Sequence, residues 1–168
     1  MLRLGLVTGT SGNVSARDGE RLLITPSALP YEQMTEDDLV ALGRDGAIVA
    51  GRREPSSEWR VHVAVYAARP DAGALVHTHS EHATAWSELD EPLGDIQCAP
   101  HAPAGSDEIA RSAVAALGDR SAVLLGSHGV LAVGPTPAAA LDLCVTLERA
   151  ARDSVSQRTQ GQALERDS

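Results

Sequence analysis

The segment PSSEWRVHVAVYAARPDAGALVHTH, residues 55–79, indicates the fold class because it holds a helix followed directly by a strand. Ser57 and the acid after it are typical of a helix start, and an apolar stripe continues to Ala68. Pro70 then stops the helix. The short apolar run 74–76 predicts a strand. A helix that leads straight into a strand, with several hairpins elsewhere, indicates a mixed α/β fold rather than a purely parallel sheet.

The predicted strand ends in a pair of histidines. Because residues i and i+2 of a strand project from the same face, His77 and His79 can present two imidazoles to one metal ion. A zinc site needs at least one further protein ligand, and His128, at a turn between two apolar runs, is a candidate. With the carboxylate of Glu58, the set describes a catalytic site better than a structural one. A His-x-His pair is also common among ordinary histidines, and the helix dipole alone favours an acid at this position.

Composition limits the classes of function. A chain of 168 residues is predicted to form one domain with a substantial core. The net charge of −9 argues against nucleic acid and against anionic membrane surfaces as partners. No leader-like segment and no run of about 18 apolar residues is present, which predicts a cytoplasmic protein.

The identity of the basic residues limits the possible reaction mechanism. All 14 are arginine, and the sequence contains no lysine. A Schiff-base aldolase needs a lysine amine. Carbanion chemistry in this chain is therefore expected to use a metal ion as the electron sink.

Other elements are expected around this centre from helix-start, hairpin and periodicity signals. They are a strand at 21–25, a hairpin turn at 43–46, helices at 80–87, 106–117 and 138–155, strands at 122–125 and 130–133, and a polar tail at 157–168 that frays. His62 and His82 are interpreted as packed or hydrogen-bonded residues, not as metal ligands.

Five segments carry a resemblance to a known family. They are SGNVS at 11–15, LITPSALPY at 23–31, PSSE at 55–58, HTH at 77–79 and HG at 128–129. Each is weak alone, but in this order and at roughly this spacing they resemble the class II aldolase/adducin family, and within it the fuculose-phosphate aldolases. The resemblance covers about residues 4–150.

The resemblance implies a fold and an assembly. The fold would be a three-layer α/β/α arrangement around a central mixed, largely antiparallel sheet, as a single domain over 1–168. Family members carry a whole helix before the Gly12–Asn13 turn, and here only a remnant, Leu2–Leu6, is left, so either the start is shortened or the natural chain begins earlier. Family members also carry further C-terminal structure, and the domain is interpreted as shortened at both ends. A homotetramer with sites at subunit interfaces is implied as well.

The resemblance also implies residue roles. Zinc, or another divalent metal, would be held by His77, His79 and His128, and Glu58 would move the proton on the enediolate carbon. Family members usually have glycine where Ala28 stands, so Ala28 is strained if its φ is positive. The substrate phosphate would be held by donors of Gly12, Asn13, Ser27, Ala28, Ser56 and Ser57.

The implied activity is a zinc-dependent aldolase that cleaves a ketose 1-phosphate to dihydroxyacetone phosphate and an aldehyde through a metal-stabilised enediolate. The alternatives are a decarboxylase, dehydratase or epimerase of a sugar phosphate, a damaged paralogue, or a non-catalytic adducin-like module. Epimerases of the family carry Asp at the position of Glu58, and adducin-like modules tend to lose the histidines. The proton-donor tyrosine of relatives has no counterpart, because Tyr31 and Tyr66 both lie outside the corresponding segment.

Overall fold

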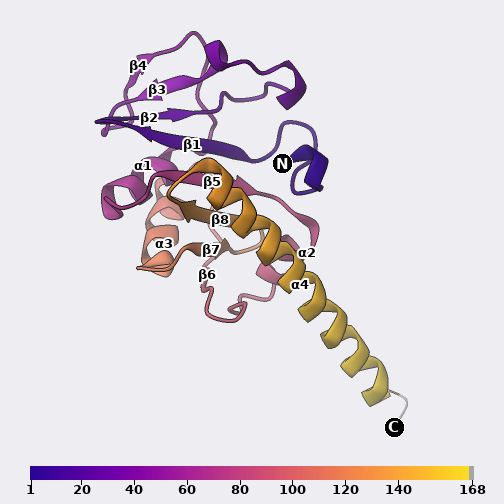
Figure 1. The fold of residues 1–168 in the computed structure, drawn as a ribbon. Coiled ribbons are helices and arrows are strands. Elements are labelled where there is room, and N and C mark those ends of the chain that lie inside the picture. The colour runs from indigo at the N-terminus through magenta and orange to yellow at the C-terminus, as the bar shows by residue number, and fades with distance from the viewer. Residues whose placement is uncertain (167–168) are drawn as a thin grey trace.

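A computed structural model describes the backbone of residues 1–166 and the side chains of residues 1–160. Its centre is one eight-stranded sheet with the strand order β4-β3-β2-β1-β5-β8-β7-β6 (Figure 1). The strands are β1 (Asn13–Asp18), β2 (Arg21–Ile24), β3 (Val40–Leu42), β4 (Ile48–Ala50), β5 (Ala74–Thr78), β6 (Cys98–Ala99), β7 (Ala122–Leu125) and β8 (Gly129–Gly134). The α-helices are α1 (Trp59–Ala68), α2 (Glu81–Ser87), α3 (Asp107–Leu117) and α4 (Pro137–Arg166).

The sheet is mixed and largely antiparallel, as the resemblance implied. Every described pair of neighbouring strands is antiparallel except β6 and β7, which are parallel. The predicted hairpin at 43–46 joins β3 to β4. Short 3-10 helices at Leu2–Leu4, Tyr31–Gln33 and Glu36–Asp38 complete the described elements.

Alternating apolar side chains divide the core into two layers. In the central strand β5, Leu75 belongs to the cluster shared with α1 and α3, whereas its neighbour Val76 belongs to the cluster shared with α4. Successive strand residues face opposite sides, so a strand buried on both faces reads as a continuous apolar run. Helices α1 and α3 cover one face and α2 and α4 the other, which confirms the α/β/α arrangement (Figure 1).

Several boundaries differ from the sequence prediction. Helix α1 begins at Trp59, so Glu58 occupies the N-cap position instead of the first turn. Strand β5 continues to Thr78, because His77 pairs with Asn13 of β1 on one side and with Leu131 of β8 on the other. Long-range pairing of this kind cannot be read from the local sequence.

Helix α4 is longer than predicted. It continues through the predicted tail as far as Arg166, and residues 167–168 lie outside the described part of the chain. Arg158 of α4 makes a bidentate ion pair with Glu91, at 2.7 and 3.2 Å, and its guanidinium lies 5.9 Å from the ring centroid of Trp86. Across the described residues, no helix combines the length and the apolarity needed to cross a membrane.

Candidate active site

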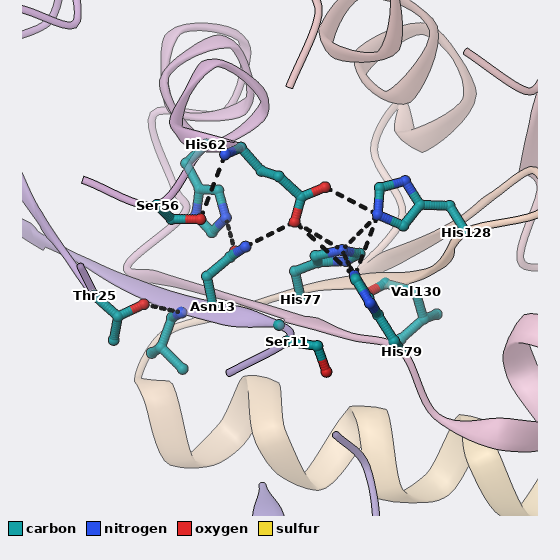
Figure 2. Close-up of polar contacts among 12 residues, drawn as sticks. Ser11, Asn13, Thr25, Ser56, His62, His77, His79, His128 and Val130 are labelled. Atoms are coloured by element: carbon teal, nitrogen blue, oxygen red, sulfur yellow. Dashed lines mark hydrogen bonds and ion pairs between the residues drawn. The ribbon is translucent and has the colours of Figure 1, made fainter. Parts of the chain in front are cut away.

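Three imidazole rings converge at one edge of the central strands. His77 lies in β5, His79 directly follows it, and His128 lies at the corner between β7 and β8. The three Nε2 atoms are close to one another: 2.7 Å from His77 to His79, 3.3 Å from His77 to His128, and 3.2 Å from His79 to His128. Figure 2 shows the rings turned toward a common point. The sequence prediction that these residues meet is therefore confirmed by the fold.

A carboxylate completes the cluster. Oε1 of Glu58 lies 2.9 Å from Nε2 of His128, and Oε2 lies 3.2 Å from Nε2 of His77 and 4.0 Å from Nε2 of His79. The ligand atoms of all four residues lie within 4.8 Å of one another. Glu58 can face the rings because it stands at the N-cap of α1, where its side chain makes no capping bond to its own helix.

The cluster fits a divalent metal ion. Two nitrogens bound tetrahedrally to one zinc at about 2.0–2.1 Å lie roughly 3.3 Å apart, which is close to the observed separations. Oε1 of Glu58 is buried, and among the described residues it has no partner in hydrogen-bond geometry, although Nε2 of His128 is near. A buried carboxylate oxygen without a donor is costly, and a cation at this point would satisfy it.

The orientation of His77 also suits a ligand. Its Nδ1 lies 2.8 Å from the carbonyl oxygen of Val130, so Nδ1 donates and the Nε2 lone pair faces the cluster. Metal-binding histidines characteristically use the other ring nitrogen in this way. The backbone of β8 thus fixes the ring tautomer that ligation requires.

Close backbone approaches hold the ligands together. Gly12 has φ 73°, and a Cβ on it would lie 2.7 Å from the carbonyl oxygen of His77. Gly129, next to His128, packs against the carbonyl oxygen of Thr78 so closely that a side chain would overlap it. Glycine at these two positions lets the N-terminal loop and the β7–β8 corner reach the end of β5.

The charges of the cluster are coupled. Burial raises the pKa of Glu58, but the neighbouring His77 and His128 outweigh it, so the net pKa lies below the ordinary value. Burial lowers the pKa of His77, but the carboxylate of Glu58 reverses that effect and raises it. Burial, assisted by the other two rings, lowers the pKa of His79 to about 4. Glu58 is therefore ionised at neutral pH, and His79 is neutral and able to ligate.

The predicted phosphate-binding residues lie on neighbouring loops. The N–H of Ser27 donates to the carbonyl of Glu54 at 3.0 Å, and the N–H of Ser56 donates to the carbonyl of Thr25 at 3.0 Å. These two bonds place the loop after β2 beside the loop before α1. Both N–H groups are therefore engaged, and Oγ of Ser56 accepts from the N–H of Glu58 at 3.4 Å. Ser27, Ala28 and Ser57 are exposed, whereas Ser56 is buried.

Two of the predicted phosphate residues show special geometry. Ala28 has φ 55°, so an alanine occupies a left-handed conformation that suits glycine, as the sequence suggested. The side chain of Asn13 is buried and donates to Oε2 of Glu58 at 2.9 Å, while its oxygen faces Nε2 of His62. The Asn13 side chain thus contacts the carboxylate, a task that the sequence interpretation did not identify.

The remaining histidines lie outside the cluster. His62 is fully buried between Asn13 and Ser15, and His82 pairs through Nδ1 with Glu148 at 2.7 Å. Neither belongs to the group of candidate metal ligands found among the described residues. Glu148 also accepts from the backbone N–H of His82 and from that of Ala83 at the start of α2. The sequence carried no local signal for Glu148, because it lies far downstream in α4.

Neither tyrosine is free to donate a proton to a substrate in this chain. The hydroxyl of Tyr31 donates to the carbonyls of Ser11 and Gly12, and that of Tyr66 contacts Ser15.

Comparisons with known proteins agree with this geometry. The family described as "Class II Aldolase and Adducin N-terminal domain" matches residues 1–155. L-fuculose phosphate aldolase of Escherichia coli O6:H1 is 44% identical over an alignment of 144 residues. The match covers 79% of this chain and 66% of the relative, so it spans just under two thirds of that protein.

Two further matches extend the comparison. A 5-methylthioribulose-1-phosphate/5-deoxyribulose-1-phosphate aldolase of Rhodospirillum rubrum is 41% identical over 160 residues, covering 88% of this chain and 72% of the relative. A solved structure of an L-fuculose 1-phosphate aldolase superposes with a TM-score of 0.90 at 31% identity, covering 95% of this chain and 82% of that chain.

Proposed function

The chain belongs to the class II aldolase and adducin family, and on that basis we propose that it is a metal-dependent aldolase that cleaves a ketose 1-phosphate. The products would be dihydroxyacetone phosphate and an aldehyde. The observation that carries the proposal is the convergence of three histidine Nε2 atoms on the buried carboxylate of Glu58. The Rhodospirillum rubrum aldolase and the solved L-fuculose 1-phosphate aldolase act, by their names, on ketose 1-phosphates, which supports this substrate class.

The metal would be held by His77, His79 and His128, with Glu58 as a further oxygen donor. The nitrogen-rich donor set favours zinc among the common divalent ions. When bound, such an ion supplies Lewis acidity that withdraws electrons from the carbonyl and hydroxyl oxygens of a substrate.

We assign the proton transfer to Glu58. Its lowered pKa keeps the carboxylate ionised, and Asn13 donates to Oε2 so that the carboxylate is held in one orientation. In the cleavage direction, the ionised Glu58 would take up the proton released by the substrate hydroxyl that becomes the aldehyde oxygen, and would deliver a proton to the carbon that becomes the hydroxymethyl carbon of dihydroxyacetone phosphate. In the reverse direction, it removes that proton.

The phosphate would be gripped by the loops beside Glu58. Ala28 and Ser57 are exposed and Gly12 is half-buried, and hydrogen bonds hold the loop after β2 beside the loop before α1, so the backbone or hydroxyl donors of these residues would bind the phosphate there. A fixed phosphate orients the reacting carbon against Glu58, and orientation of this kind can lower a barrier by several kcal/mol, on the order of 7 at best.

The same site could also serve a decarboxylase, dehydratase or epimerase, since all of them remove or generate charge beside a carbonyl. One observation favours these alternatives: Tyr31 and Tyr66 are both committed to other contacts, so this chain supplies no phenol for the aldehyde oxygen. The three retained histidines favour catalysis over an adducin-like interaction role.

A homotetramer with sites at subunit interfaces and a cytoplasmic location belong to the same proposal. A neighbouring subunit could supply the missing proton donor. The thiols of Cys98 and Cys144 are both free, which is compatible with a reducing compartment.

The test is deuterium exchange from D2O into dihydroxyacetone phosphate, followed by proton NMR. The zinc-loaded wild-type protein should exchange one carbon-bound hydrogen, and Glu58→Gln should abolish the exchange while still folding. Cleavage of fuculose 1-phosphate and close analogues then tests the complete reaction. Absence of both exchange and cleavage with zinc demonstrably bound would contradict the proposed function.

A further inference from the structure

A buried line of polar side chains runs from the site into the core. Asn13 donates to Glu58 at 2.9 Å, and its oxygen lies 2.5 Å from Nε2 of His62. Nδ1 of His62 lies 2.7 Å from the hydroxyl of Ser15, which lies 3.1 Å from the hydroxyl of Tyr66. Each of the five residues is more than 90% buried. The contact between Asn13 and His62 is visible in Figure 2.

The line follows from the periodicities of two elements. Glu58, His62 and Tyr66 are four residues apart on one face of α1. Asn13 and Ser15 are two residues apart, so they project from one face of β1. Where the helix face packs on the strand face, the polar residues interleave.

The direction of every hydrogen bond in the line is determined. An ionised carboxylate only accepts, so Asn13 must turn its NH2 group to Glu58 and its oxygen to His62. Nε2 of His62 must then donate. In the neutral ring Nδ1 accepts, so the hydroxyl hydrogen of Ser15 is committed to His62.

The last step of the line follows from that commitment. Because Ser15 has no second hydrogen, Tyr66 must donate to the oxygen of Ser15. All donors therefore point toward Glu58. Burial lowers the pKa of His62 to about 3, in agreement with a neutral ring.

The far end of the line is anchored. The guanidinium of Arg17 lies 4.8 Å from the ring centroid of Tyr66 and donates to the carbonyls of Tyr66, Arg69 and Ala72. The Tyr66 ring is therefore held at the end of α1. The line runs from this fixed phenol to the carboxylate of the site without a gap.

We propose that Ser15, His62 and Tyr66 are positioning residues that orient the Glu58 carboxylate through Asn13. The inference rests on the proposed role of Glu58 as the proton carrier. A core made of aliphatic side chains would fill the same space without polar groups, which are costly to bury unless fully satisfied. Reversal of the His62 tautomer would turn the Asn13 amide around and place its oxygen against the carboxylate.

The tautomer of His62 is the direct test, and it needs neither metal nor substrate. Nitrogen-15 NMR of histidine-labelled, metal-free protein at neutral pH should show His62 as a neutral ring protonated at Nε2, identified by its absence in His62→Gln. In Ser15→Ala, Nδ1 loses its donor, so the Nδ1 resonance should shift, whereas Nε2 should stay protonated against the oxygen of Asn13. An Nδ1–H or doubly protonated ring in the wild-type protein would overturn the proposal.

A kinetic series supplies the second arm. His62→Leu should lower the kcat for deuterium exchange by about 10–100-fold, since a displacement near 1 Å can cost about 100-fold. The KM for dihydroxyacetone phosphate should change little, because the phosphate loops are untouched. His62→Gln keeps one donor and one acceptor and should recover most of the loss. Tyr66→Phe removes only the last donor and should have a smaller effect than Ser15→Ala.

The NMR and kinetic measurements distinguish failure of the positioning role from failure of the proposed function. Equal kcat in the wild-type protein and His62→Leu, or no recovery in a folded His62→Gln, would overturn the positioning role. If the wild-type protein itself exchanges no deuterium, the proposed function is wrong, and the His62 tautomer still decides whether the directed line exists.

Discussion

Replacement of Ala28 by glycine should stabilise this protein, although glycine substitutions usually destabilise. Ala28 has φ 55° in an exposed loop. A left-handed conformation costs a residue with a Cβ roughly 1–2 kcal/mol. Glycine removes that cost but gives the unfolded chain more freedom, which takes back about 0.4–1 kcal/mol. The net gain should be about 0.5–1 kcal/mol, which corresponds to a Tm increase of roughly 1–4 °C for a domain of this size.

The assay is urea and thermal unfolding of metal-free protein, monitored by circular dichroism. The matched control is Ala115→Gly on the exposed face of α3, which should lose about 1 kcal/mol because its backbone is helical. The N–H of residue 28 survives the change, so the KM for a phosphorylated substrate should stay the same. A loss of stability in Ala28→Gly as large as that in Ala115→Gly would refute the strain at this position.

Three further predictions address the site and its support. His77→Ala should abolish tight zinc binding in a competition titration, whereas His82→Gln should bind zinc like the wild-type protein. The pKa of His62 is lowered to about 3 in the folded protein. The stability that the neutral His62 contributes is therefore fully present above the unfolded pKa and is lost as the pH falls toward the folded pKa. In metal-free protein the difference in unfolding free energy between wild type and His62→Gln should therefore shift by about 1.4 kcal/mol per pH unit below roughly pH 6.5. Glu148→Gln should lower the free energy of unfolding by about 1 kcal/mol because it weakens the start of α2, whereas Arg149→Gln should change it by less than about 0.5 kcal/mol.

The three candidate metal ligands could be found in the sequence because their geometry is partly local. His77 and His79 share a strand face at any register, and a histidine followed by glycine is typical of an exposed corner such as that of His128. The resemblance to the family then placed His128 with the other two. The end of β5 was not predictable, because it is set by pairing with β1 and β8.

The contacts of Glu58 illustrate what the local sequence could not provide. An acid after a serine indicates a helix start. The sequence left open whether Glu58 is a catalytic carboxylate or an ordinary acid that the helix dipole favours. Its N-cap position turns the side chain away from its own helix, and the partner that fixes its orientation, Asn13, is 45 residues distant. Such a contact depends on how α1 packs on β1. Sequence periodicity indicates which residues share a face of each element, but not that the two faces pack against each other. Polar residues four positions apart on α1 (Glu58, His62 and Tyr66) and two positions apart on β1 (Asn13 and Ser15) are the sequence pattern from which the buried polar line could have been predicted.

Charge explains how an acidic protein can bind an anionic substrate at this point. The chain contains 23 acidic residues, yet Glu58 is the one carboxylate in the metal-ligand group found among the described residues. With three neutral histidines, a divalent ion and this carboxylate sum to +2 − 1 = +1 at the site. Addition of a second carboxylate there would cancel that charge, whereas the net charge of −9 is spread over the remaining surface. Under the proposed function, a single ionised Glu58, held by Asn13 and not by a further acid, would serve proton transfer and leave the site positive enough for a phosphate.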